Sequence, residues 1–383
     1  MTDRTREYLR GRTRAYYRQT TLTPPPDADR REWGYIPWAE AGPGMIRHRD
    51  LASLGELSAF GARDGPQHVY HSAAVYDEPG APTMAEKGWR GADLIFDIDA
   101  EYVPETAPGE DAYATALTEC KRALVRLLSF LEADFGFHDL EIVFSGSRGY
   151  HVHVRDPGVR ELTSTQRREI ADYVLGLGVE LDAMIRTEPL GDGVTRRVLP
   201  TDGGWPGRVH QRLVTLLDRV AAMDDDTALE TLQSYEGVGE RRANAALTVA
   251  RTNREALVAG NLSANPAIVA LARAVLDETR ELAAVQIDDP VTTDTNRLIR
   301  LPGSLHGGSA LAVCRIDRAD VATFDPLIEA VPDVFRDDEI GIDVTRGGSV
   351  ELGGETHTLE EGPCVVPEYL ALFLMARGRA TKV

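Results

Sequence analysis

The amino-acid sequence predicts a mixed α/β fold that is interrupted by a mostly helical insertion. Strand-like patterns occupy both ends of the chain, whereas helical patterns dominate its middle. The chain has 383 residues, which is more than one compact core usually holds. We therefore expect residues 1–162 and 283–383 to form one discontinuous α/β domain, and residues 163–282 to form a helical insertion subdomain.

Local patterns justify each expected element in turn. In the clearest helix, Leu117, Cys120, Leu124 and Leu131 recur at helical spacing and form one apolar face. The expected elements are an N-terminal helix ahead of Pro24, a buried strand over 93–99, a helix over 110–135, strands over 141–144 and 150–155, and a C-terminal helix over about 367–377.

The charge balance is unusual and informative. Lys and Arg number 42 against 61 Asp and Glu, which gives a net charge of −19. Proteins that hold nucleic acid usually carry a basic surface, so charge alone gives no support to such a function. Only Lys87, Lys121 and Lys382 are lysines, and a dense acidic surface with few lysines suits a protein of a halophile. Because molar salt screens charges beyond about 3 Å, this surface does not exclude DNA binding.

Targeting features are absent from the sequence as it stands. No apolar run approaches the roughly 20 residues that span a bilayer, and the N-terminal residues are highly charged. The three cysteines, Cys120, Cys314 and Cys364, are far apart and show no disulfide pattern. We therefore expect no membrane association and a cytoplasmic location.

Two carboxylates close the strand over residues 93–99. Asp97 and Asp99 are two positions apart, so both side chains project from the same face of the strand. Adjacent carboxylates repel each other, and a divalent cation relieves that repulsion while gaining oxygen ligands. An isolated Asp-x-Asp is also typical of a solvated turn, and Asp93 and Glu101 add to the local acidity. The motif therefore needs a third acid and phosphate ligands before it indicates a metal-dependent enzyme.

A glycine-rich loop supplies candidate phosphate ligands. Residues 145–149 join the two central strands, and their two glycines allow backbone N–H groups to point toward an anion. Ser145 and Ser147 offer hydroxyl groups, Arg148 offers a planar fork for phosphate oxygens, and His151 opens the next strand. Taken alone, this string is equally typical of a plain hairpin, and His151 of a hydrogen-bonded core histidine.

A downstream segment adds further acids and bases within residues 287–306. Asp288 is one candidate to complete a carboxylate triad, but the sequence alone does not choose among Asp288, Asp289 and Asp294. Strand-like alternation places Arg300 on one face, where it and His306 could meet triphosphate oxygens.

The order and spacing of these stretches resemble the small catalytic subunit of archaeal and eukaryotic primases, and the end of the chain resembles the archaeal branch. The resemblance implies the catalytic fold of that family and a metal-dependent polymerase that makes short primers on single-stranded DNA from nucleoside triphosphates. The matching stretches are residues 31–35, 45–48, 87–89, 92–99, 145–151, 288–306 and 366–370.

The resemblance also assigns roles to individual residues. It implies that Asp97, Asp99 and Asp288 are catalytic ligands of two Mg²⁺ or Mn²⁺ ions. The incoming nucleotide and its triphosphate would be bound by Ser145, Arg148, His151, Arg300 and His306, with Ser147 contributing less charge than a basic residue found there in relatives. Arg47 and His48 are expected contacts of the template or the nucleotide.

One departure from the family pattern concerns zinc. Family members often carry a zinc site of cysteines and a histidine soon after the Asp-x-Asp strand, but residues 100–119 contain neither residue type. Cys120 alone cannot provide the four ligands of a structural zinc site. We therefore expect no structural zinc, with the acidic loop over 101–111 in its place.

The resemblance implies one partner, and three alternatives to the implied function stay open. Relatives act with a large subunit that carries an iron–sulfur cluster, and this chain has no cysteine set for such a cluster. One alternative is a repair or end-joining polymerase of the same superfamily. Another is a non-catalytic nucleic-acid-binding subunit, although none of the expected acids is missing. An unrelated metal-dependent protein adapted to salt is the remaining possibility.

Overall fold

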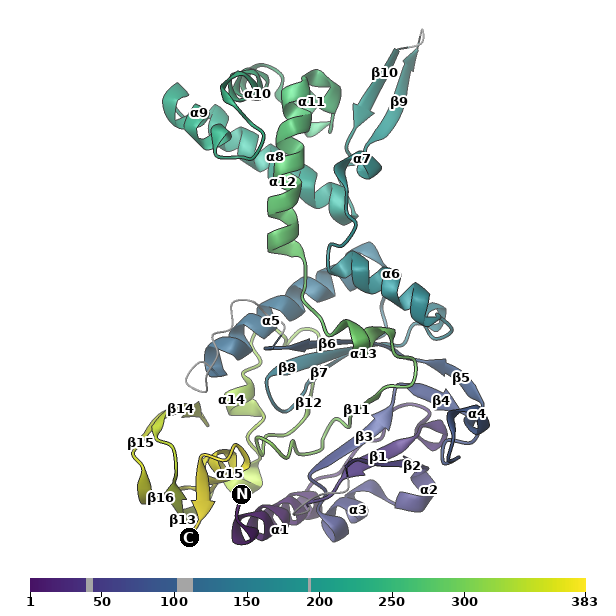
Figure 1. Ribbon diagram of the computed structural model, residues 1–383, viewed down its shortest axis with the longest axis vertical. Helices are drawn as coiled ribbons and strands as arrows, with labels where there is room; N and C mark the ends of the chain where they lie inside the picture. Colours follow the sequence, from purple (N-terminus) through teal and green to yellow (C-terminus); the bar gives the residue numbers. More distant parts are fainter. Residues whose placement is uncertain (39–43, 102–112, 192–193) are drawn as a thin grey trace. The chain divides into compact units, whose positions relative to one another are not determined.

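The computed structural model describes residues 1–38, 44–101, 113–191 and 194–383 (Figure 1). These residues fall into two compact units, which we describe separately. The first unit contains Met1–Val125, Phe137–Ala171 and Gln286–Val383, and the second contains Arg126–Gly136 and Asp172–Val285. The mixed α/β fold expected from the sequence is confirmed, because the described residues form both helices and several small sheets.

A four-stranded antiparallel sheet in the first unit carries the acidic strand. Its order is β12-β7-β8-β6. Tyr113 and Cys120 of α5 donate hydrogen bonds to the loop that joins β7 and β8. In the register between β6 and β8, Asp97 faces His151 and Asp99 faces Gly149. The strands are β6 (Leu94–Asp99), β7 (Leu140–Phe144), β8 (Gly149–Val154) and β12 (Cys314–Ile316), and the helix is α5 (Tyr113–Ser129).

A second antiparallel sheet of the first unit has the order β11-β3-β1-β2. In the sequence, β4 and β5 follow β3 of this sheet and precede β6 of the first sheet. A buried cluster that includes Tyr76, Ile95, Val291 and Ile299 contains side chains from β4 and from both sheets. The strands are β1 (Trp33–Ile36), β2 (Ile46–Arg49), β3 (His68–Ser72), β4 (Ala74–Tyr76), β5 (Trp89–Ala92) and β11 (Leu298–Arg300).

The C-terminal part of the first unit forms a third sheet and a hairpin. The apolar helix α15 (Glu368–Ala376) buries Leu370, Phe373 and Leu374 against this part of the unit. The third sheet has the order β16-β13-β17, and β14 pairs with β15. The strands are β13 (Glu339–Val344), β14 (Gly348–Leu352), β15 (Glu355–Leu359), β16 (Gly362–Pro367) and β17 (Ala380–Lys382).

Shorter helices complete the first unit, together with α1 at its N-terminus. Thr2 caps α1 by accepting a hydrogen bond from the Thr5 N–H at 3.2 Å. These helices are α1 (Asp3–Gln19), α2 (Leu51–Leu54), α3 (Leu57–Asp64), α4 (Met84–Lys87), α13 (Asp289–Thr293) and α14 (Pro326–Glu329). The helix α6 (Ser164–Val174) begins in the first unit and ends in the second.

The second unit is built mainly from helices around a core of leucine, valine and alanine side chains. It also contains one antiparallel hairpin, which the helical patterns of the sequence did not indicate. Its elements are α7 (Leu181–Met184), β9 (Arg186–Gly191), β10 (Val194–Val198), α8 (Gly204–Ala221), α9 (Asp225–Gln233), α10 (Glu240–Thr252), α11 (Arg254–Val258) and α12 (Pro266–Ala283).

The predicted elements around the acidic strand agree with the structure to within a few residues. The helix expected over 110–135 is described from Tyr113 to Ser129 and continues as a π-helical turn over Phe130–Asp134. The expected start of that helix at 110–112 and most of the acidic loop over 101–111 lie outside the described residues. No helix in the described ranges is long and apolar enough to cross a membrane.

Candidate active site

The acidic strand end presents two carboxylates on one face. Buried Phe96 and Ile98 anchor β6 in the core, while Asp97 and Asp99 retain 20% and 31% of their side-chain exposure. Because β6 pairs along its length with β8, the backbone of both acids is fixed by the sheet. The strand therefore delivers two oxygen-bearing side chains to the same edge of the site.

Asp288 is the third acid that the structure brings to this edge. Its backbone N–H donates a hydrogen bond of 2.9 Å to the Asp97 carbonyl, just before α13 begins. Asp289 instead accepts a hydrogen bond from Arg168 at 2.9 Å, and exposed Asp294 accepts one from the Asn296 N–H at 2.8 Å. Among the three candidates left open by the sequence, Asp288 is thus the one tied to the acidic strand.

Burial and neighbouring carboxylates raise the pKa of two of the three acids, Asp97 and Asp288. Burial raises the pKa of Asp97 to about 7, with further increases from Asp99 and Asp288, while Arg300 and Arg297 oppose the change. Burial also raises the pKa of Asp288. Among the described residues, no group of three or more His, Cys, Asp or Glu side chains is gathered at metal-ligand geometry.

The donor set nevertheless fits hard divalent cations. All three side chains offer carboxylate oxygens, which Mg²⁺ and Mn²⁺ prefer over nitrogen or sulfur ligands. Burial is the largest cause of the raised pKa of Asp97, and the neighbouring carboxylates add repulsion that the local arginines offset only in part. Two positive charges at this edge would offset that repulsion.

The loop between β7 and β8 is a tight hairpin that requires its glycines. The Ser145 N–H donates to the Gly149 carbonyl at 3.0 Å. Gly146 has a φ of 81°, and a Cβ there would lie 2.7 Å from the Cβ of His306. A Cβ at Gly149 would lie 1.9 Å from the Ile98 carbonyl oxygen, so this position excludes every other residue type. The glycines thus bring the loop against both the acidic strand and His306.

Arg148 projects from this loop toward acidic side chains. Its guanidinium forms an ion pair with Glu101 and lies 3.6 Å from an Asp99 carboxylate oxygen. The side chain is 38% exposed, so it is accessible to a ligand. Ser145 is buried and Ser147 is partly exposed in the same loop.

His151 lies beside Asp97 as a neutral ring. Its Nε2 is 3.6 Å from Asp97 Oδ1, and burial together with Arg300 and Arg297 lowers its pKa to about 3. The pair is therefore not an ion pair at neutral pH, despite the short distance. The Nδ1 atom of His151 has no hydrogen-bond partner in the described part of the chain. A neutral imidazole with an unsatisfied nitrogen is suited to donate or accept one hydrogen bond from a ligand.

Arg300 contributes positive charge near Asp97 and the two histidines. It occupies β11 across from Tyr70, with its guanidinium carbon 5.9 Å from the ring centroid. It lowers the pKa values of Asp97, His151 and His306, which places its charge near each of them. Within the described residues, its Nε has no hydrogen-bond partner.

His306 is buried beside the loop and is neutral. Burial lowers its pKa well below the ordinary value, and Arg300 adds to the effect. Its ring packs edge-on against His68 at a centroid distance of 4.7 Å. Its Nδ1 lies 3.2 Å from both the Gly308 N–H and the Ser309 hydroxyl. The expected histidine is thus fixed by its own turn.

Arg47 and His48 belong to a different polar cluster, which surrounds Glu32. Arg47 donates to Glu32 at 3.0 Å, and so does the backbone N–H of His48, whose φ is 58°. Fully buried Lys87 contacts the other Glu32 oxygen at 3.1 Å. Arg47 is exposed and His48 is partly exposed, and the structure ties both to Glu32 and not to Asp97, Asp99 or Asp288.

Sequence reasoning gave no role to two residues, Arg297 near the acids and Lys87 beside Glu32, and misjudged a third. Arg297 lowers the pKa values of Asp97, Asp288 and His151. It lies just before β11, outside the strand alternation, so no sequence pattern indicated that it lies near the acids. Lys87 lies in one of the stretches that resemble the family, but the sequence suggested no function for it. Asp93, which we had treated as part of the general acidity, is fully buried and forms an ion pair with Arg31 at 2.9 Å.

Comparisons with known proteins bear on this arrangement. The family model described as "DNA primase small subunit" matches residues 96–316, which include Asp97, the loop and Asp288. The chain is similar to the DNA primase small subunit PriS of Haloarcula marismortui, at 54% identity over all of this chain and 99% of the relative. It is also similar to the PriS proteins of Natronomonas pharaonis, at 50% identity over the same shares, and Methanothrix thermoacetophila, at 39% identity over 99% of each chain.

Proposed function

Because this chain belongs to the DNA primase small subunit family, we propose that it is the catalytic subunit of a primase that makes short primers on single-stranded DNA. The reaction is template-directed nucleotidyl transfer from nucleoside triphosphates. The observation that supports it most is the backbone hydrogen bond from Asp288 to Asp97, because it holds the segment that carries Asp288 against the strand that carries Asp97 and Asp99. The acidic composition of the chain matches the haloarchaeal source of several relatives.

Asp97, Asp99 and Asp288 would hold two Mg²⁺ or Mn²⁺ ions. When bound, such ions lower the pKa of the primer 3′-hydroxyl and offset charge on the departing pyrophosphate. This role requires no side-chain base. The carboxylates therefore contribute position and charge, and their mutual repulsion favours cation binding.

The basic and neutral ligands act on the triphosphate. Arg148 would exchange its contacts with Glu101 and Asp99 for phosphate oxygens, which its planar fork can bind in pairs. His151 contributes a hydrogen bond without adding positive charge, because its pKa lies near 3. Arg300 adds positive charge near Asp97. Together with Ser145, Ser147 and His306, they orient the α-phosphate for attack.

The same proposal extends to partners and location. The name "small subunit" in relatives implies a complex with a larger subunit, and we propose such a partner for this chain. An iron–sulfur cluster of the complex would belong to that partner. Single-stranded DNA and nucleoside triphosphates are the proposed substrates, Arg47 and His48 remain proposed template or nucleotide contacts, and the proposed location is the cytoplasm.

Primer synthesis on an unprimed single-stranded template tests this function directly. We expect the full-length chain, in molar potassium chloride with nucleoside triphosphates, to form short products with Mg²⁺ or Mn²⁺ and none after chelation. Addition of the large subunit is the matched second condition. Extension of a primed template without synthesis on an unprimed one would instead indicate an end-joining polymerase. Absence of any nucleotide transfer would indicate a non-catalytic subunit.

Elemental analysis tests the proposed lack of structural zinc. Burial raises the pKa of Cys120 to about 12, and its thiol donates to the Arg148 carbonyl at 3.3 Å. Since a zinc ligand must be a thiolate, this residue is poorly suited to the role. We expect less than about one zinc per ten chains after chelator washing. Stoichiometric zinc that survives the wash would contradict the proposal.

A further inference from the structure

Two hydroxyl groups hold consecutive peptide groups of the glycine-rich loop. The Tyr113 hydroxyl donates to the Ser147 carbonyl at 2.6 Å, and the Ser309 hydroxyl donates to the Gly146 carbonyl. The two donors come from segments far apart in sequence, at the start of α5 and after β11. The loop therefore receives hydrogen bonds from two separate parts of the fold.

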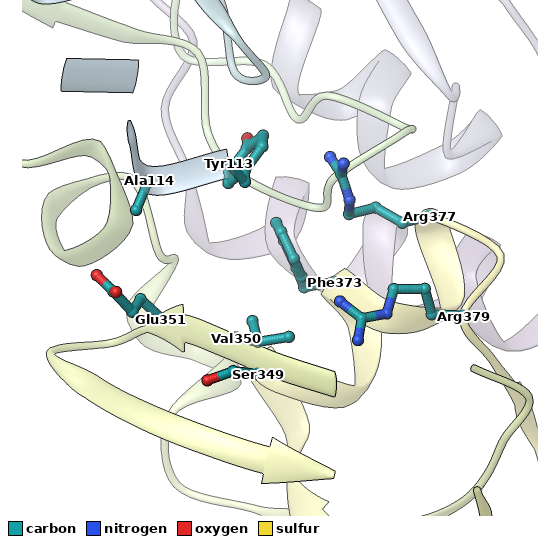
Figure 2. A pocket seen from close by; sticks show the side chains of 8 residues that line it. All are labelled: Tyr113, Ala114, Ser349, Val350, Glu351, Phe373, Arg377 and Arg379. Carbon is teal, nitrogen blue, oxygen red and sulfur yellow. The ribbon is translucent and has the colours of Figure 1, made fainter. Parts of the chain in front are cut away.

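The ring of Tyr113 is itself fixed in place. It is buried, and it packs edge-on against Phe373 of α15 at a centroid distance of 5.6 Å. The Arg377 guanidinium carbon lies 4.5 Å from the centroid of the Tyr113 ring. Figure 2 shows these three side chains gathered on one side of a small pocket. The hydroxyl group consequently has a defined position from which to reach the loop.

Ser309 connects the loop to a second proposed nucleotide ligand. Its side chain is fully buried, and its oxygen lies 3.2 Å from Nδ1 of His306. The Leu311 N–H donates to the same oxygen at 3.2 Å, so the hydroxyl is held from both sides. The Ser309 hydroxyl thus bonds to the Gly146 carbonyl and lies in contact with the His306 ring.

Anchored carbonyls determine where the rest of the loop points. A peptide group is planar and trans, so its N–H points away from its C=O. Holding the Gly146 and Ser147 carbonyls therefore orients the N–H groups of Ser147 and Arg148 and the start of the Arg148 side chain. Without such contacts, a loop with Gly146 at a φ of 81° would sample many conformations.

We propose that Tyr113 and Ser309 are positioning residues for nucleotide binding, acting through the peptide groups of Gly146 and Ser147. This inference rests on the proposed function, because it assumes that the loop binds the triphosphate. Both residues act through the backbone and need not touch the substrate. Their contribution is to reduce the conformational entropy that the loop would otherwise lose on binding.

Removing each hydroxyl group alone tests the proposal. Tyr113→Phe keeps the ring contacts, and Ser309→Ala removes only the oxygen. We expect each variant to raise the KM for nucleotide about fivefold to tenfold, as loss of one buried hydrogen bond implies, with kcat within about twofold of the wild type. Nucleotide affinity measured by calorimetry should weaken by the same factor.

The matched control is Thr279→Val in the second unit. Thr279 is also buried, and its hydroxyl donates to the Val275 carbonyl at 2.6 Å. We expect this variant to leave the KM for nucleotide unchanged, because Thr279 lies in α12 and its hydroxyl donates within that helix, not to the loop. An unchanged KM and affinity in both loop variants, or an equal change in the control, would overturn the inference. Failure of the wild type to make primers would count against the proposed function. The nucleotide affinities measured by calorimetry would still test the positioning role.

Discussion

Asp97→Asn is expected to abolish primer synthesis while making the metal-free protein more stable. Asparagine keeps the shape of the side chain but removes a charged metal ligand from the centre of the site. We expect activity to fall by at least about a thousandfold, which is the scale of losing a major electrostatic contribution to the transition state. Loss of function with a gain in stability would separate a catalytic role from a structural one.

The stability gain follows from the direction of the pKa shift. The folded protein raises the pKa of Asp97 from 3.8 to about 7, so the charged form is disfavoured by folding. A raised carboxyl pKa means that stability is lost as pH rises from about 4 through about 7. Asparagine does not ionise, so at pH 8 the variant avoids a cost on the order of 2–4 kcal/mol. At pH 5 the advantage should be much smaller, because Asp97 is then largely protonated.

Urea unfolding at pH 8 and pH 5 in the presence of a chelator measures this difference, and the primer assay measures activity. Adding Mn²⁺ should stabilise the wild type more than the variant, because the wild type binds the ion more tightly. Asp294→Asn is the matched control, since Asp294 is exposed and is not tied to the acidic strand. Near-normal primer synthesis by Asp97→Asn would refute the assignment.

Local sequence patterns predicted the acidic strand and the loop because both depend on neighbouring residues. The alternation of a strand places Asp97 and Asp99 together whatever surrounds them. Two glycines between two apolar runs indicate a hairpin in the same way. The structure adds that Gly149 admits no side chain, which only the close approach of Ile98 explains.

The choice of the third acid was beyond local reasoning. Asp288, Asp289 and Asp294 are equivalent as sequence, and a single backbone hydrogen bond to Asp97 distinguishes Asp288. The neutrality of His151 likewise depends on burial by distant segments. Such properties arise from tertiary packing, which no pattern within twenty residues encodes.

The expected separation of an insertion also illustrates this limit. Helical periodicity identified the middle of the chain as different, but periodicity does not reveal which core a helix joins. The residues Arg126–Gly136 group with the second unit although they continue α5. A helical pattern that continues without a break therefore does not show that the chain passes from one compact unit to the other.

Asp93→Ala is expected to destabilise the first unit by about 3–5 kcal/mol, which is the usual cost of breaking a buried ion pair. The fully buried Asp93 carboxylate accepts hydrogen bonds from Arg31 at 2.9 Å and from Arg155 at 3.1 Å. Its removal leaves the Arg31 guanidinium buried, with the carbonyls of Pro26, Ser72 and Ala73 as its remaining hydrogen-bond partners in the described part of the chain. Burial already lowers the pKa of Arg31, so the loss of the nearest negative charge would deepen that penalty.

An exposed acid that accepts hydrogen bonds from the same number of arginines shows how much of the destabilisation comes from burial. Asp77 also pairs with two arginines, Arg30 and Arg90, but its side chain is 42% exposed. Asp77→Ala should cost no more than about 1 kcal/mol, and less in molar salt, where exposed charges are screened. The cost of Asp93→Ala should change little with salt. Equal costs for the two variants in urea unfolding would contradict the expectation that burial makes the Asp93 ion pairs costly to break.

The position of Asp93 makes this a test of function as well as stability. It immediately precedes β6, and its backbone N–H donates to the Ala73 carbonyl at 3.0 Å. Arg167 donates to the Asp93 carbonyl at 2.9 Å, so the start of the acidic strand is held by side chain and backbone together. Loss of the carboxylate should therefore displace Asp97 and lower primer synthesis even at temperatures where the variant remains folded. In a chain with a net charge of −19, one buried acid would then serve to place the others.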